Sequence, residues 1–152
     1  MRVLFSVFLL FTLTLTISAC DNKNIEREFF DKNKTVDARA VAIKDYSIEK
    51  QWDIYKYGID NISPYPVELA EPMSSGGKDL VNHVINDLYG NRNDQRQLAA
   101  VLMLGLVQSG KCYDVCSDGS VIGKLKSYKN KIKDDNYAFI YMDSVKRMCI
   151  VK

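Results

Sequence analysis

The 152-residue sequence has few of the side chains on which most catalytic and metal sites depend. His83 is its only histidine, and cysteine occurs four times. A general base acts only beside its nucleophile or substrate, and a zinc site needs at least three protein ligands. Cys112 and Cys116 are spaced Cys-x-x-x-Cys, which is not the Cys-x-x-Cys of redox motifs. We therefore expect no metal, no cofactor and no catalytic residue, and predict that the protein is not an enzyme.

Neither sign of charge dominates the chain. Lysine and arginine total 21 and aspartate and glutamate total 19, which gives a formal net charge of +2. Nucleic-acid-binding domains are usually far more basic, so no nucleic-acid partner is expected. The mixing of the two signs also predicts no polybasic segment for anionic lipid.

Segments that alternate polar and apolar residues over the length of a strand are also lacking. Helical spacing instead recurs along the chain, beginning after a candidate N-cap at Ser47. The predicted helices cover residues 48–59, 66–74, 79–89, 94–109, 120–132 and 137–149. The helix at 94–109 is apolar nearly all round, which predicts that it is the central and most buried one. The fold class expected is all-α.

The amino end has the layout of a secretory signal. Arg2 is followed by the uncharged, mostly apolar run 3–17 and then by Ser18-Ala19-Cys20. Ile17-Ser18-Ala19-Cys20 resembles the lipobox of bacterial lipoproteins. The resemblance implies that residues 1–19 are a signal peptide and that Cys20 is acylated after cleavage. Asp21 resembles the signal that retains such lipoproteins in the inner membrane, with the folded part facing the periplasm. An uncleaved anchor helix and a plain secretory signal are the alternatives.

The polar, charged segment after this motif predicts a spacer. Residues 20–46 are expected to form the lipidated amino terminus and an irregular tether, with a short helix near residues 25–30. The folded helical domain is expected to cover residues 47–152.

The lipidation implied at Cys20 leaves three cysteines for disulfide chemistry. A bridge from Cys116, or from Cys112, to Cys149 ties the last helix to the middle of the domain. In the entropic model, closing a loop of roughly 30 residues contributes about 3 kcal/mol. A local bridge between Cys112 and Cys116 is the alternative, and either pairing leaves one thiol.

Residues 69–110 suggest a repeat. A short helix, a Gly-Gly pair, a longer helix, the turn Asn93-Asp94-Gln95-Arg96 and an Ala-rich helix ending in Leu104-Gly105 follow one another. This order resembles HEAT-type repeats, which implies a small array of antiparallel helix pairs. An irregular helical bundle is the alternative.

The aromatic residues are the main candidates for binding. Tyrosine and tryptophan are enriched in binding hot spots, although they also fill the ends of thin helical domains. The four candidates are Trp52, Tyr55, Tyr65 and Tyr137. Glu68 and Glu71 lie three residues apart, which suits the first turn of a helix better than a pair of catalytic acids.

These features predict a periplasmic, membrane-anchored module that binds a protein partner without catalysis. A narrower hypothesis is an immunity protein that protects its host against a periplasmic toxin. One alternative is an envelope-maintenance lipoprotein that holds a lipid or cell-wall ligand in an apolar groove between helices. The other, a cell-wall hydrolase, requires a catalytic pair that the sequence does not display.

Overall fold

The computed structural model describes residues 24–90 and 94–150, and within them every regular element is helical. The prediction of an all-α fold is therefore confirmed. The α-helices are α2 (Ile25–Lys32), α3 (Val36–Ala42), α4 (Ile48–Asn61), α5 (Ala70–Ser74), α6 (Gly77–Gly90), α7 (Asp94–Ser109), α8 (Gly119–Tyr128) and α9 (Asp135–Ile150). Short 3-10 helices lie at η1 (Ile43–Asp45), η2 (Val67–Leu69), η3 (Val115–Ser117) and η4 (Lys129–Lys131).

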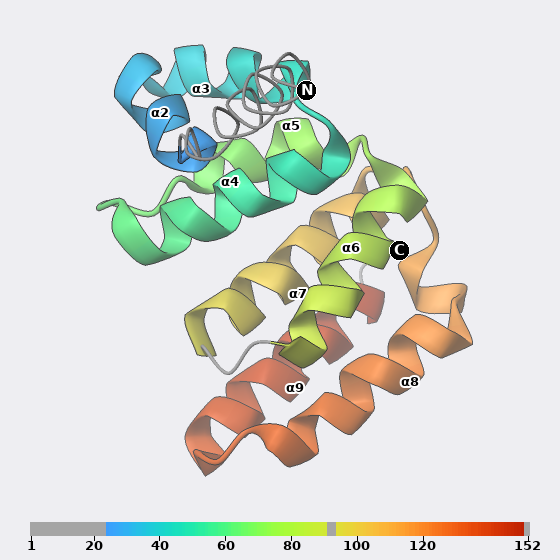
Figure 1. The fold of residues 1–152 in the computed structure, drawn as a ribbon. Coiled ribbons are helices and arrows are strands. Elements are labelled where there is room, and N and C mark those ends of the chain that lie inside the picture. Colours follow the sequence, from blue (N-terminus) through green and yellow to red (C-terminus); the bar gives the residue numbers. More distant parts are fainter. Residues whose placement is uncertain (1–23, 91–93, 151–152) are drawn as a thin grey trace, which may run out of the picture.

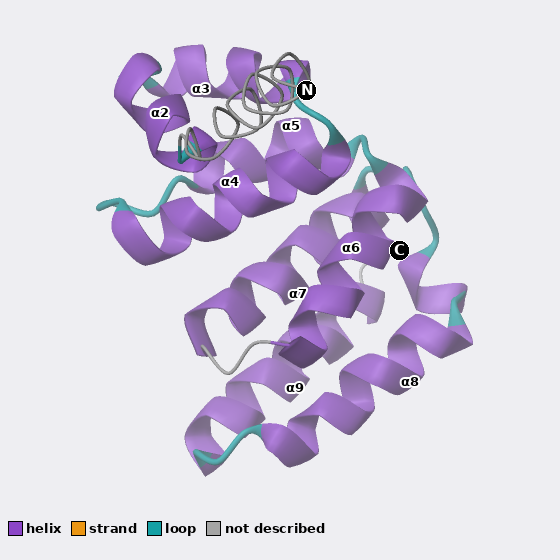
Figure 2. Cartoon of the chain, in the orientation of Figure 1, coloured by secondary structure: helices purple, strands orange, loops and turns teal. Residues whose placement is uncertain are grey.

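The helices form a bundle-like array with two groups. Figure 1 shows α2 to α5 at one end of the molecule and α6 to α9 at the other. Helix α7 joins the groups, because it packs against α4 and α5 on one side and against α6 and α9 on the other. Its predicted central position is confirmed. Only short loops connect the helices in the described part of the chain (Figure 2).

Local sequence signals explain most of the helix boundaries. The Ser47 hydroxyl accepts a hydrogen bond from Lys50 N and caps α4, as predicted. Asp118 caps α8 in the same way through Ser120 N and Val121 N. The predicted helix at 66–74 is instead the 3-10 helix η2 followed by α5. Helix α6 begins at Gly77 with a φ of +54°, which glycine adopts without a steric penalty.

The predicted tether is wrong for the described part of residues 20–46. Residues 25–45 form α2, α3 and η1, and the side chains of Phe29, Phe30 and Ile43 are buried in the core. Phe29 packs edge-on against Tyr46, and Phe30 stacks on Tyr57 of α4. The folded domain therefore begins by Ile25 and not at residue 47.

Two ion pairs also hold this segment to the rest of the domain. Arg39 of α3 donates to Glu68 of η2 at 3.2 Å, and both side chains are largely shielded from solvent. Lys50 of α4 reaches Glu26 of α2 at 2.9 Å. These contacts fix α2 and α3 on the domain, whereas a spacer would move independently of it.

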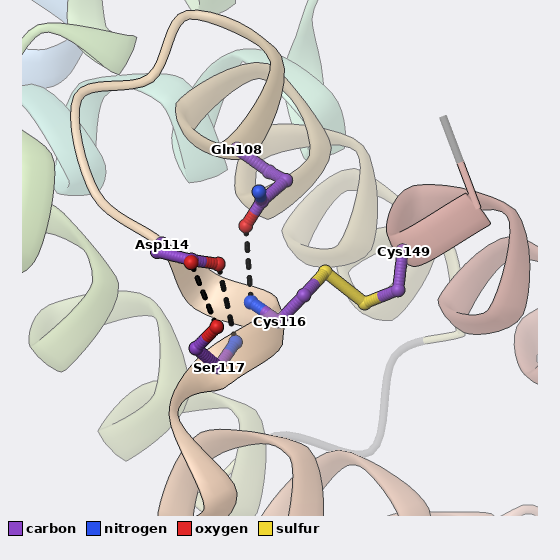
Figure 3. Close-up of a disulfide and its surroundings, with 5 residues drawn as sticks. All are labelled: Gln108, Asp114, Cys116, Ser117 and Cys149. Carbon is purple, nitrogen blue, oxygen red and sulfur yellow. Dashed lines mark hydrogen bonds between the residues drawn. A yellow bond between two sulfur atoms is a disulfide. The ribbon is translucent and has the colours of Figure 1, made fainter. Parts of the chain in front are cut away.

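A disulfide joins Cys116 of η3 to Cys149 of α9, which confirms the favoured pairing (Figure 3). The backbone around Cys116 is held in place, because its N–H donates to Gln108 Oε1 at 3.0 Å. Asp114 accepts hydrogen bonds from the hydroxyl and the N–H of Ser117, and these bonds lower the pKa of its carboxyl. Cys112 keeps a free, exposed thiol.

The predicted signal peptide, Cys20 and Asp21 lie outside the described residues. Among the helices of residues 24–90 and 94–150, none combines the length and the apolar character that crossing a bilayer requires.

Candidate binding groove

The floor of the clearest candidate site is one face of α7. Most apolar side chains of this helix are buried, but Leu102 is 60% exposed and Leu106 is half-buried. These two leucines lie one turn apart, so they project from the same face of the helix. Gly105 lies beside them and lines the same groove. A helix that is apolar all round therefore leaves one apolar face uncovered by the rest of the domain.

The walls of the groove come from both groups of helices. One wall consists of Tyr55 of α4, Val67 of η2 and Ala70 of α5, and the other consists of residues from α9. The α9 residues are Ser144, Arg147 and Met148. The groove has a volume of about 420 Å³ and is lined mainly by apolar atoms. Val67 is itself 65% exposed, so the wall is open to solvent.

The charges near the groove lie on its rim. The Tyr55 ring is buried, and this burial raises the pKa of its hydroxyl to about 12, with the negative charge of Glu68 adding to the effect. Tyr55 is therefore neutral at ordinary pH. At the outer edge, Arg147 pairs with Asp143 at 2.6 Å in an exposed ion pair. The groove thus has an uncharged interior beside a charged α9 edge.

The four aromatic candidates do not form one surface. Trp52 and Tyr55 are buried, with ring centroids 5.8 Å apart, and only Tyr55 borders the groove. Tyr65 is 48% exposed and lines a separate surface hollow next to Pro64. Tyr137 is half-buried in the first turn of α9. Helical spacing placed Trp52 and Tyr55 on the core face of α4, which explains why they are buried.

His83 lies in a different, polar hollow of about 300 Å³ between the start of α4 and α6. Ser47, Glu49 and Asp79 line the same hollow. Nucleophilic catalysis uses a hydrogen bond between the nucleophile and its base. Among the described residues, no hydrogen bond joins His83 to Ser47 or to a carboxylate. Among the same residues, no group of three or more histidine, cysteine, aspartate or glutamate side chains is placed to hold a metal ion.

Glu68 and Glu71 have separate environments. Glu68 is held in its partly buried ion pair with Arg39, and Glu71 is exposed in the first turn of α5. Their positions near the start of a helical turn agree with the structural interpretation of this pair.

In comparisons with known proteins, no family model, curated protein or solved structure matches this chain. The resemblances to lipoproteins and to HEAT repeats thus rest on sequence motifs alone.

The sequence contained one overlooked signal for the groove. Apolar residues cover nearly the whole circumference of α7, more than a helix in a small bundle can bury. They are Val101, Leu102, Met103, Leu104, Leu106 and Val107. Such a pattern indicates either complete burial or an uncovered apolar face. Only the packing of α5 and α9 beside α7 decides between these two outcomes.

Proposed function

We propose that this protein is a membrane-anchored binding module of the bacterial periplasm, and that an apolar segment of a protein partner occupies the α7 groove. The observation that carries the proposal is the open apolar groove, with Leu102 and Val67 both more than half exposed. Contiguous exposed apolar surface of this kind marks interaction sites in soluble domains. An immunity protein against a periplasmic toxin is one specific form of such a module.

The openness of the groove favours a protein over a small molecule. A small ligand in this groove would stay partly in water, whereas a protein segment would cover Leu102 and Val67 together. Peptide helices commonly dock in grooves through apolar residues spaced three or four apart. The Arg147–Asp143 ion pair at the rim adds a charged edge beside the groove, which suits a partner with polar groups next to its apolar side chains.

The proposed membrane anchor is Cys20, on the strength of the lipobox. Acylation of a cysteine by several chains holds a protein firmly, since each buried CH₂ contributes about 0.8 kcal/mol. Cys20→Ser should move the protein from the membrane fraction to the soluble periplasm, and globomycin should block its processing. A Cys20→Ser protein that still fractionates with membranes would indicate an uncleaved helix.

The groove is tested by site-specific photo-crosslinking in cells. A photoreactive residue at Leu102 should yield a discrete adduct with one protein, while the same residue at Val41 should not. Val41 of α3 is a suitable control because it is 71% exposed and lies outside the groove. The partner identified in this way is then purified and its affinity for the groove variants is measured.

A filled groove should weaken that affinity at least tenfold. Gly105→Leu adds a side chain at the groove, where its new Cβ would lie 3.9 Å from Met148 Cγ. Gly123→Leu is the matched control, because in the part of the chain that the structure describes its new Cβ would meet no atom within 4 Å outside its own helix backbone and chain neighbours. Equal affinity of both variants for the purified partner would overturn the groove as the binding site.

The volume of the groove favours one further candidate, an apolar ligand such as a lipid acyl chain. Ligand sites typically have volumes of about 300–1,000 Å³, and this groove lies in that range. Native mass spectrometry of protein purified from membranes distinguishes the two functions. A bound lipid that Gly105→Leu displaces and Gly123→Leu retains would favour the ligand-binding function.

A further inference from the structure

A run of lysines covers the turn between α8 and α9. The five lysines of residues 124–133 are all exposed, and no acidic residue occurs between Asp118 and Asp134. We call this set the lysine surface, which comprises Lys124, Lys126, Lys129, Lys131 and Lys133. The near-zero net charge of the whole chain does not reveal this local excess of positive charge. The balance of positive and negative charge in the whole chain therefore does not hold at this turn.

Three members of the lysine surface differ from several other cations of the domain in how their charge is balanced. Arg39, Lys50, Lys56 and Arg96 all pair with carboxylates inside the domain. By contrast, Lys126, Lys129 and Lys133 make no ion pair with any residue that the structure describes. Their positive charge is therefore directed at solvent, or at whatever binds there.

Exposed apolar side chains follow these lysines in the sequence. Helix α9 packs against η4 and begins directly after the turn. In its first two turns Phe139 is 73% exposed and Ile140 is 46% exposed. Where an exposed aromatic ring and cations contact one partner, the ring provides affinity and the charges provide orientation.

Acidic residues at the start of α9 reduce the positive charge at that edge of the lysine surface. Asp134 accepts a hydrogen bond from Tyr137 N and caps α9, and Asp135 lies in the first turn of the helix. Asp143 is paired with Arg147. The lysines on α8 and η4 precede these residues, so the positive surface extends along α8, away from the acidic start of α9.

The position of the lysine surface bears on whether its partner is an anionic membrane or an acidic protein. Figure 1 shows the turn between α8 and α9 at the opposite end of the molecule from α2. If Cys20 carries the lipid, its chain reaches Asn24 over four residues, about 14 Å at full extension. The bilayer then lies near α2, and the lysine surface faces away from it.

We propose that the lysine surface and Phe139 bind an acidic patch on a protein partner. The inference rests on the proposed function, because the anchor at Cys20 sets which end faces the periplasm. It extends that function by assigning a second contact and its chemistry: carboxylates that meet Lys126, Lys129 and Lys133, around an apolar residue that covers Phe139. The lysines accelerate encounter with such a partner, and Phe139 slows its dissociation.

The probe for this surface is a fluorescein-labelled peptide of alternating glutamate and leucine. It is titrated against the full-length protein purified from membranes in a non-ionic detergent, and fluorescence anisotropy reports binding. The triple variant Lys126→Glu/Lys129→Glu/Lys133→Glu should weaken binding at least tenfold, and Phe139→Ala about threefold or more. Carbodiimide coupling, which joins amines directly to carboxylates, should attach the peptide at these lysines in the parent protein.

A charge-matched variant controls for net charge. Lys44→Glu/Lys111→Glu/Lys146→Glu changes the total charge equally at exposed lysines elsewhere, and should keep most of the affinity. Equal weakening by both triple variants would overturn the proposal. So would binding of phosphatidylglycerol vesicles through the same lysines without binding of the peptide. Gly105→Leu fills the groove. Peptide binding that this variant removes is therefore assigned to the groove, whereas binding that only the triple lysine variant removes is assigned to the lysine surface.

Discussion

Gly58 of α4 lies directly against the ring of Phe30 of α2. A Cβ built on Gly58 would come within 2.7 Å of Phe30 Cζ and still closer to Pro66 Cγ. A glycine in the interior of a helix costs stability relative to alanine, so its place here is explained by the close approach. The contact shows how tightly the amino-terminal helix is packed on the domain.

Gly58→Ala should therefore destabilise the protein, although alanine is the better helix former. Overpacking typically costs about 1–3 kcal/mol, which exceeds the gain of up to about 1 kcal/mol in helix propensity. Urea unfolding followed by fluorescence measures the change. Trp52 suits this purpose because it is the only tryptophan and is buried.

Gly123→Ala is the control for that experiment. It lies in the interior of α8 and its new Cβ would have open space, so it should stabilise the protein by about 0.5–1 kcal/mol. If Gly58→Ala also stabilised the protein, the contact of α2 with α4 would be looser than the structure indicates.

The sequence was sufficient to predict features that depend on local interactions. Ser47 could be identified as a cap, and α7 could be bounded at Asp94 and Ser109, because capping and helical periodicity are local. The burial of Phe29 and Phe30 could not be predicted, because it depends on Gly58 and Tyr57 far along the chain. The residues around Phe29 and Phe30 are mostly polar or charged, so the segment as a whole reads as an exposed spacer.

The candidate site was predictable only in part, for the same reason. The apolar circumference of α7 is a property of its sequence, but the groove also needs α5 and α9 at particular positions beside it. Trp52 and Tyr55 were grouped as binding aromatics because they are close in sequence. Their helical spacing instead places both in the core, with Tyr55 alone at the groove.

Phe29→Ala tests whether residues 25–45 belong to the core. The Phe29 side chain is 1% exposed, and truncation of such a phenylalanine costs about 3–5 kcal/mol. An irregular tether would instead tolerate the change. Val36→Ala is the control within the same segment, because Val36 is 55% exposed and its loss should change the stability by less than about 0.5 kcal/mol. The urea midpoints of the two variants provide the comparison.

Loss of the Cys116–Cys149 bridge should destabilise the domain. The double variant Cys116→Ser/Cys149→Ser removes a link across 33 residues, which is worth about 3–4 kcal/mol in the entropic model. Cys112→Ser should have an effect within about 0.5 kcal/mol, because its side chain is exposed and free. A reductant should lower the urea midpoint of the parent and of Cys112→Ser, but not that of the double variant. A reductant effect that survives in the double variant would mean that the stabilising bridge involves another cysteine.

The buried Tyr55 hydroxyl should make the protein less stable at alkaline pH. Its pKa is raised to about 12 in the folded state, chiefly by burial, against about 10 in the unfolded chain. The unfolded state therefore releases the proton first, so this contribution is fully present below pH 10 and is lost as the pH rises toward 12. A difference of about two pKa units corresponds to roughly 2–3 kcal/mol.

Tyr55→Phe cannot ionise, so the free energy of unfolding of this variant should fall less steeply between pH 10 and 12. Between pH 7 and 9, the parent and Tyr55→Phe should differ by a constant amount. Parallel alkaline profiles for the two proteins, measured by urea unfolding at each pH, would show that Tyr55 ionises as readily in the folded chain as in the unfolded one.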